Sequence, residues 1–253
     1  MNPYKNCPVY ENENYLLRLV EVSDAQDLLL VYSDEKAVPY FNSDNCHGDD
    51  FHYTTPERME SAVGFWRTAY EQNAFVRWTI IDKRTHRANG TVIENACTTS
   101  VGSASNAVTG NAGAATAGAA TAGAAVGTIE LFNRQARDFY HDCGLLRLDL
   151  RSDYENADSI REILSLIVPP AFDLFGCNMI ATKIPPFAIP RKTAAEAFGF
   201  TASEEKLIGG DDNREYGDYY ICKRQIIGVY KRSAACDIVQ LEHLDNQIDA
   251  KVP

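Results

Sequence analysis

The chain has 253 residues, with 24 lysines and arginines against 35 aspartates and glutamates, so its formal net charge is −11. With 45% apolar and 23% charged residues it has the composition of an ordinary globular protein. A negative chain without a Lys/Arg cluster repels polyanions, which excludes DNA and RNA as partners. We expect no membrane span, because no run of about 18 apolar residues occurs. The polar N-terminus carries no signal peptide pattern, which predicts a cytoplasmic protein.

The seven cysteines are scattered along the chain, and no two of them form a C-x-x-C pair. An odd number without regular spacing predicts neither a disulfide framework nor a zinc site. We expect thiols in a reducing compartment, with Cys177 and Cys222 in the core, and no metal site.

A strand is expected over 15–22, where the sequence reads YLLRLVEV. Ser23 is the expected N-cap of the first helix, with Gln26 three residues on as its capping-box partner. A long loop from about Lys36 to Thr55 follows.

Thr55 and Pro56 are a favourable N-cap and first residue for a second helix. Apolar residues at helical spacing predict its core face, formed by Met59, Ala62, Val63, Trp66, Ala69 and Tyr70. The sequence FVRWTII then predicts a strand over 75–81, followed by a turn over 82–87.

Residues 96–127 are almost wholly Ala, Gly, Thr, Ser, Asn and Val, with ATAGA repeated at 115–119 and 120–124. Two near copies flank them, GTVIE at 90–94 and GTIE at 127–130. This predicts a flexible low-complexity insertion within a hairpin connection, without chemistry of its own. We expect it to interrupt a single domain over 1–225, and 226–253 to be a C-terminal extension.

A strand is expected over 128–132, and residues 145–164, LLRLDLRSDYENADSIREIL, predict a strand, a tight turn and a helix. Alternation places Leu146, Leu148 and Leu150 on one strand face and Arg147, Asp149 and Arg151 on the other. The helix should begin near Ala157, be kinked or broken at Pro169-Pro170 and end at Gly176.

The turn at 153–158 is chemically unusual. A strand leading into a helix is the layout with which many folds bind a phosphate at the helix N-terminus. A phosphate-binding turn needs bare amides and no nearby negative charge. This turn instead lacks glycine and carries three carboxylates, those of Asp153, Glu155 and Asp158.

The last predicted elements are a strand over 178–183, a short helix over 191–198 and a strand over 215–223. One strand-helix-strand crossover supplies a parallel pair, and the other strands are linked by hairpins. We therefore predict an α/β (α+β) fold with a mixed, mostly antiparallel central sheet flanked by helices.

This order resembles the GNAT N-acetyltransferase superfamily, and its ribosomal-protein N-acetyltransferase-like branch in particular. The resemblance spans about 15–224 without the insertion. It is carried by YLLRLVEVSDAQDLLLVYSD, VRWTIIDKR, GTIELFNR, LLRLDLRSDYENADSIREIL, AEAFGF and EYGDYYICKR. It implies acyl-CoA-dependent transfer of an acetyl group to a primary amine, either of a small molecule or of a protein N-terminus. The alternative is a catalytically inactive GNAT-fold protein that binds another ligand or a partner.

The resemblance implies acetyl-CoA between splayed central strands. Pantetheine would lie along Leu148 and Leu150, and the pyrophosphate would meet Arg151, Asn156, Ala157, Asp158 and Ser159. The family pattern Arg/Gln-x-x-Gly-x-Gly/Ala is altered, because Asn156 and Asp158 replace the glycines and Glu155 stands near the basic position. Ala188 and Arg191 occupy short-helix positions where the family often has Asn and Ser. This degenerate loop predicts weakened or shifted binding of CoA.

Acetyl transfer needs an amine deprotonated and a thiolate protonated. Candidate bases are Glu130 and Asp149 on central strands. The alternative interpretation is an ion-paired strand carboxylate, with Asp149 between Arg147 and Arg151.

Tyr219 is the candidate acid, although alternation places Tyr219 and Tyr220 on opposite faces, so that at least one of them packs in the core. His47 and His52, in the first long loop, would border the acceptor substrate in this fold. Their alternative interpretation is that of ordinary surface histidines.

Overall fold

The computed structural model describes residues 2–88, 91–94, 123–210 and 213–224. Its main feature is an eight-stranded sheet in the order β1-β2-β3-β6-β7-β8-β12-β9, in which β7 and β8 are the parallel pair. This confirms the predicted mixed, mostly antiparallel sheet. The strands are β1 Tyr10–Glu11, β2 Tyr15–Leu19, β3 Val76–Asp82, β6 Ala124–Arg134, β7 Cys143–Leu150, β8 Met179–Lys183, β9 Thr201–Ala202 and β12 Tyr219–Lys223.

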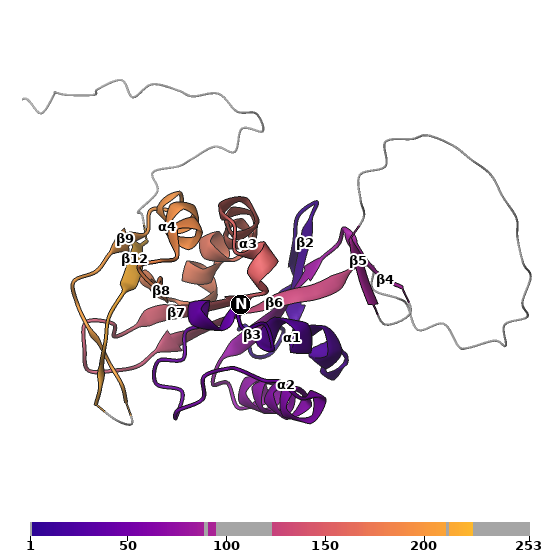
Figure 1. Cartoon of the computed structure of the whole chain (residues 1–253). Helices are drawn as coiled ribbons and strands as arrows, with labels where there is room; N and C mark the ends of the chain where they lie inside the picture. The colour runs from indigo at the N-terminus through magenta and orange to yellow at the C-terminus, as the bar shows by residue number, and fades with distance from the viewer. Residues whose placement is uncertain (1, 89–90, 95–122, 211–212, 225–253) are drawn as a thin grey trace, which may run out of the picture.

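Helices cover both faces of the sheet (Figure 1). One face carries α1 (Ala25–Tyr32) and α2 (Pro56–Glu71), and the other carries α3 (Ala157–Phe175) and α4 (Ile189–Glu196). The smaller elements are η1 Val22–Asp24, η2 Val38–Tyr40, η3 Ser152–Tyr154 and two short ladders, β4 Thr85–Ala88 with β5 Thr91–Glu94 and β10 Leu207–Ile208 with β11 Glu215–Tyr216. Within the described residues, no helix is both long and apolar enough to cross a membrane.

The two helix starts test the capping predictions. Thr55 caps α2 as expected, since its side chain accepts a hydrogen bond from the Arg58 amide, at 3.3 Å. The predicted Ser23–Gln26 capping box is wrong. Glu21 and Asp24 form the box around η1 instead, and α1 begins only at Ala25.

The predicted insertion is shorter at its C-terminal end than the composition indicated. β6 begins at Ala124, and Ala124, Ala125 and Val126 are buried there against β3. Small side chains suit this stretch because the strands are close: a Cβ on Gly127 would lie 2.3 Å from the Asp149 carbonyl oxygen. Residues 95–122 and 225–253 lie outside the described part, so the flexible insertion and the C-terminal extension stay predictions.

α3 is not broken by its two prolines, so of the predicted kink or break the break is wrong. The helix continues through Pro169 and Pro170 because its buried stripe continues on the same face, from Ile167 and Val168 to Ala171. It ends at Gly176, which takes the expected left-handed conformation with φ 64°.

The last predicted strand is divided in two. Asp218 has φ 63°, and this left-handed residue separates β11 from β12. Tyr219 and Tyr220 then face opposite sides as predicted, and Tyr219 is buried whereas Tyr220 is half-buried.

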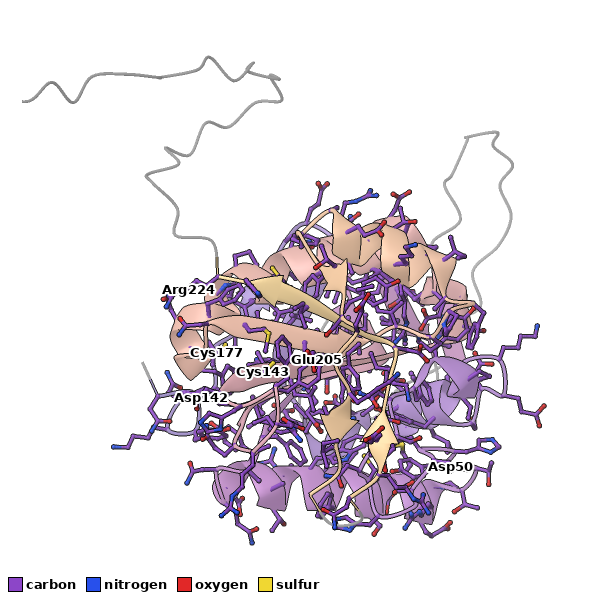
Figure 2. The ribbon with its side chains drawn as sticks, turned by 90° about the vertical axis from the view of Figure 1, so that its left-hand side faces the viewer. Asp50, Asp142, Cys143, Cys177, Glu205 and Arg224 are labelled. Carbon is purple, nitrogen blue, oxygen red and sulfur yellow. The ribbon has the colours of Figure 1, made fainter. Side chains whose placement is uncertain are left out.

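The five described cysteines carry free thiols, and Cys177 and Cys222 are buried as predicted. Cys143 and Cys177 lie close together near the start of β7 (Figure 2).

Candidate functional site

The central feature of the sheet is the divergence of its parallel strands. β8 pairs with β7 from Cys143 to Leu146, and the described chain supplies no β8 partner for the rest of β7. In this antiparallel pair, every second residue of β7 forms its backbone hydrogen bonds with β6. The series continues to the bond from the Arg151 amide to the Val126 carbonyl, at 3.0 Å. The backbone groups of Leu148 and Leu150 therefore point to the gap rather than to β6. Their side chains are buried in the core beneath α3.

The turn after β7 uses its polar groups internally. The amides of Tyr154, Glu155 and Asn156 donate to carbonyls within the turn, and the Asn156 side chain accepts from the Ser159 amide at 3.0 Å. α3 begins at Ala157 as predicted, and this cap is the reason. Asp158 forms an exposed ion pair with Arg161. These amides of the turn are therefore already used within the protein.

A buried ion pair joins this turn to α4. Arg191 donates to both oxygens of Glu155, with 2.8 Å from Nε to Oε2, and also donates from Nη1 to the Tyr40 carbonyl at 2.9 Å. The side chains of Arg191 and Glu155 are 5% and 4% exposed. Arg151, in contrast, pairs with Asp153 at the surface of the turn. Three segments distant in sequence therefore meet at one guanidinium.

On the opposite face, between the sheet and α2, lies a pocket of about 680 Å³. Charged side chains of three neighbouring strands, Arg77, Glu130 and Arg147, reach it from the sheet. Its aromatic lining consists of Phe51, Tyr53, Phe65, Trp66 and Phe75. The loop before α2 contributes Asn45, Cys46, His47, Gly48 and Asp49, and α2 itself contributes Arg58, Ser61 and Ala62. Asp50 lies on the surface of the same loop (Figure 2).

The charges at this pocket belong to a buried network across β3, β6 and β7. Glu130 accepts from Nε and Nη2 of Arg77, at 3.1 and 2.5 Å, and from Arg147 at 2.8 Å. Asp149 accepts from Arg77 at 3.1 Å and from the Tyr32 hydroxyl at 2.8 Å. The Arg77 guanidinium also lies 4.2 Å from the centre of the Trp66 ring.

Comparison with solved structures identifies the architecture. The chain is similar to Mycobacterium smegmatis RimJ in complex with CoA-disulfide, with 12% identity, a TM-score of 0.55, and coverage of 88% of this chain and 90% of that one. It is also similar to the ribosomal-protein-S5-alanine acetyltransferase of Vibrio fischeri, with 16% identity, a TM-score of 0.52, and coverage of 85% and 94%. A GNAT-family acetyltransferase of Bacillus anthracis matches with 13% identity, a TM-score of 0.51, and coverage of 85% and 98%. The chain has the GNAT acetyltransferase fold. No protein-family profile and no curated protein matches its sequence.

Within this GNAT fold, the predicted pairing of Asp149 is wrong. Its partners are Tyr32 and Arg77, because alternation directs Asp149 to the face of α1, while Arg151 turns to Asp153. One oxygen of Asp149, Oδ1, and Nε of Arg147 have no hydrogen-bond partner among the described residues. The Asp149 oxygen is therefore able to accept one further hydrogen bond, and the Nε–H of Arg147 is able to donate one.

Glu130 lies on the central strand β6, as predicted, and lines the pocket, but its environment favours a permanent charge. Burial opposes ionisation, yet the charges of Arg77 and Arg147 outweigh it and lower the pKa of Glu130 below the ordinary value of 4.5. A carboxylate with a lowered pKa is a poor proton acceptor. The ion-paired interpretation therefore fits Glu130 better than that of a base.

Tyr219 is buried beside Asp44, to which its hydroxyl donates at 3.1 Å. Burial and the Asp44 charge raise the pKa of Tyr219, so the phenol stays protonated. Asp44 also pairs with Lys183 at 2.6 Å, and its carbonyl accepts from Arg147 at 3.0 Å. Tyr219 thus lies one residue away from the pocket network.

The two predicted histidines differ. His47 lines the pocket, whereas His52 is half-buried and its Nε2 has no partner in the described chain. Sequence reasoning missed Arg77 and the Arg191–Glu155 pair. A charged residue inside the apolar strand FVRWTII was the available signal for Arg77.

The buried charge of Glu130 predicts sensitivity to acid. Because the folded-state pKa is lowered, Glu130 contributes stability above its unfolded pKa, and this is lost as the pH falls through the folded value. Urea unfolding from about pH 6 to about pH 3 should therefore show a steeper loss for the native chain than for Glu130→Gln. Asp82 and Asp138, whose pKa values are also lowered, are common to both proteins and cancel in the comparison. Equal slopes would contradict the prediction.

Proposed function

We propose that this protein is an acyl-CoA-dependent N-acetyltransferase that moves an acetyl group to a primary amine, of a small molecule or of a protein N-terminus. The observation that carries the proposal is the edge of β7 beyond Leu146, which has no β8 partner among the described residues. This edge lies between the gap beside β8 and the pocket on the opposite face. Its Leu148 and Leu150 backbone faces the gap beside β8, and its Arg147 side chain reaches the pocket. Similarity to structures named as acetyltransferases, one of them a CoA complex, supports the same reading.

The residues present fit acetyl-CoA unevenly. The free backbone of Leu148 and Leu150 and the unpartnered Oδ1 of Asp149 suit the amide-bearing pantetheine. Arg191 suits a phosphate, because a guanidinium binds phosphate and carboxylate in the same two-bond geometry. That guanidinium is held by Glu155, so the phosphate end fits once Arg191 changes partner. When bound, the thioester would supply the activated acyl group.

The pocket on the other face is the proposed acceptor site. The net charge of −11 favours the approach of an ammonium group, and the aromatic lining favours a cation or an apolar side chain. The two carboxylates of the lining, Asp49 and Glu130, are paired with arginines of the same pocket. Glu130 is tied to two arginines, so we assign removal of the ammonium proton to His47, which lines the pocket. Histidine is the side chain that most readily exchanges protons near neutral pH. Because burial and the Asp44 charge raise the pKa of Tyr219, this phenol is a poor proton donor, and we assign protonation of the departing thiolate to solvent.

The test is turnover of acetyl-CoA with a panel of peptides bearing free or blocked N-termini and with small primary amines. Release of free CoA thiol and mass spectrometry of the amine would report the transfer. Turnover with free amines and none with blocked ones is expected. Absence of both cofactor binding and turnover would contradict the function.

The role of His47 gives a sharper prediction. His47→Ala should lower kcat/KM by about 100-fold or more, the usual contribution of a general base. The matched control is His141→Ala, because His141 is 55% exposed and pairs with Asp142 in the β6–β7 connection. A His47→Ala protein that melts like the native chain and retains nearly full activity would remove His47 from the mechanism.

A second function is favoured by one observation, the buried Glu155–Arg191 pair. If this pair never opens, the protein binds a ligand or partner in the pocket without catalysis. Calorimetry with acetyl-CoA on the native chain separates the two functions, because the inactive protein gives no heat even at millimolar cofactor.

A further inference from the structure

We propose that Glu155 acts as a built-in anion: its carboxylate occupies Arg191, the residue proposed to bind a phosphate of the cofactor. Arg191 becomes available only when a phosphate displaces this carboxylate. The inference rests on the proposed function, since it names the group that controls cofactor binding at that site. It follows from the position of the two side chains, from their hydrogen bonds and from the burial of the ion pair.

The pair sits where the chain is laid out to receive an anion. Glu155 directly precedes Asn156, the N-cap of the 19-residue helix α3, and follows the strand that faces the gap. The dipole of α3 favours negative charge at such a position. In this chain, the carboxylate of Glu155 supplies that negative charge.

Arg191 is bound as it would be by a phosphate. Its Nε and Nη2 donate to the two oxygens of one carboxylate, and Nη1 donates to the Tyr40 carbonyl. The Tyr40 ring lies 5.5 Å from the guanidinium carbon. Two phosphate oxygens can replace the two carboxylate oxygens without a change in the number of hydrogen bonds, so the exchange is chemically like for like.

Burial distinguishes this pair from the other charges of the turn. The Asp158 side chain is 88% exposed and that of its partner Arg161 is 45% exposed, so solvent screens that pair. The carboxylate of Asp153 is 44% exposed. Glu155 and Arg191 are 4% and 5% exposed, so neither can lose its partner without leaving a buried charge. An incoming anion is the natural replacement for Glu155.

The test measures binding of inorganic pyrophosphate and of CoA by calorimetry, using the full chain. Glu155→Gln should bind both about tenfold tighter than the native protein, because the competing charge is gone while the side-chain volume is kept. The matched control is Asp158→Asn, which removes one charge from the same turn and should change affinity by less than about threefold. The double variant Glu155→Gln/Arg191→Gln should lose the gain.

If Glu155→Gln does not fold without an anion, Glu155→Asp replaces it. This variant keeps the charge and retracts it by one methylene, so pyrophosphate should raise its melting temperature more than that of the native chain. Equal gains for Glu155→Gln and Asp158→Asn, or no gain in either Glu155 variant, would overturn the proposal.

The outcomes also separate this proposal from the function. A native protein that transfers acetyl groups, with no gain from Glu155→Gln, overturns the built-in anion alone. Tighter pyrophosphate binding by Glu155→Gln, in a protein whose native form neither binds acetyl-CoA nor acetylates amines, overturns the proposed function alone.

Discussion

Replacing Arg77 with methionine should lower the free energy of unfolding by about 3–5 kcal/mol, the loss expected when one partner of a buried ion pair is removed. Arg77 is 1% exposed and is the shared partner of Glu130 and Asp149, which are equally buried. The substitution leaves two carboxylates without this cation in the interior of the sheet. Methionine fills most of the arginine volume, so the effect reports charge rather than a cavity.

Urea unfolding at neutral pH is the measurement, and Arg58→Met is the matched control. Arg58 pairs with Asp49 and stacks on Tyr53, yet its side chain is 59% exposed, so its loss should cost no more than about 1 kcal/mol. A native-like midpoint for Arg77→Met would show that the network contributes little to stability.

Gly127→Ala is expected to destabilise the protein by about 1–3 kcal/mol, because a methyl group has no room between β6 and β7. A Cβ there would lie 2.3 Å from the Asp149 carbonyl oxygen and 3.1 Å from the Leu150 Cα, both backbone atoms that cannot rotate away. The strands must separate where β7 carries the edge proposed for the cofactor. Acetyl-CoA affinity should therefore fall together with stability.

The control for Gly127→Ala is a second glycine-to-alanine substitution, which should raise stability rather than lower it. Gly64 lies inside α2 with open space around its Cβ position, so Gly64→Ala should raise stability by about 0.5–1 kcal/mol through helix propensity. Urea midpoints of the two variants give the comparison. A stable Gly127→Ala protein with unchanged cofactor affinity would mean that the β6–β7 spacing is wider than described.

Local patterns predicted most of the fold. Alternation in LLRLDL predicts Leu148 and Asp149 on opposite faces, as the structure has them, and Thr55-Pro56 and Gly176 mark real helix ends. The errors arose where a tertiary contact outweighs a local rule. Asp24 replaces Gln26 as the capping-box partner, with Glu21 as the N-cap of η1, and its carboxylate is also fixed there by Arg18 and Thr79. Pro169-Pro170 remain helical because the buried stripe of α3 continues past them.

The candidate site could be predicted only in part, since its partners are distant in sequence. Glu130 and Asp149 were predicted as central carboxylates, but nothing local indicates that Asp149 bonds Tyr32, 117 residues away. The three carboxylates of the turn predict a poor phosphate site, and this stays a prediction. That Glu155 binds Arg191, 36 residues further on, depends on the packing of α4 against α3, which no short pattern encodes.

The bond from Arg191 to the Tyr40 carbonyl has a thermodynamic consequence. Tyr40 closes η2, and the chain continues from there into the loop that lines the acceptor pocket. A ligand that changes the partner of Arg191 therefore also acts on the segment that shapes the other site. The two binding equilibria are then linked, and by reciprocity each ligand must change the affinity of the other by the same factor. Dissociation constants measured for each ligand with and without the other would give that factor, and a value of one would show that the sites are independent.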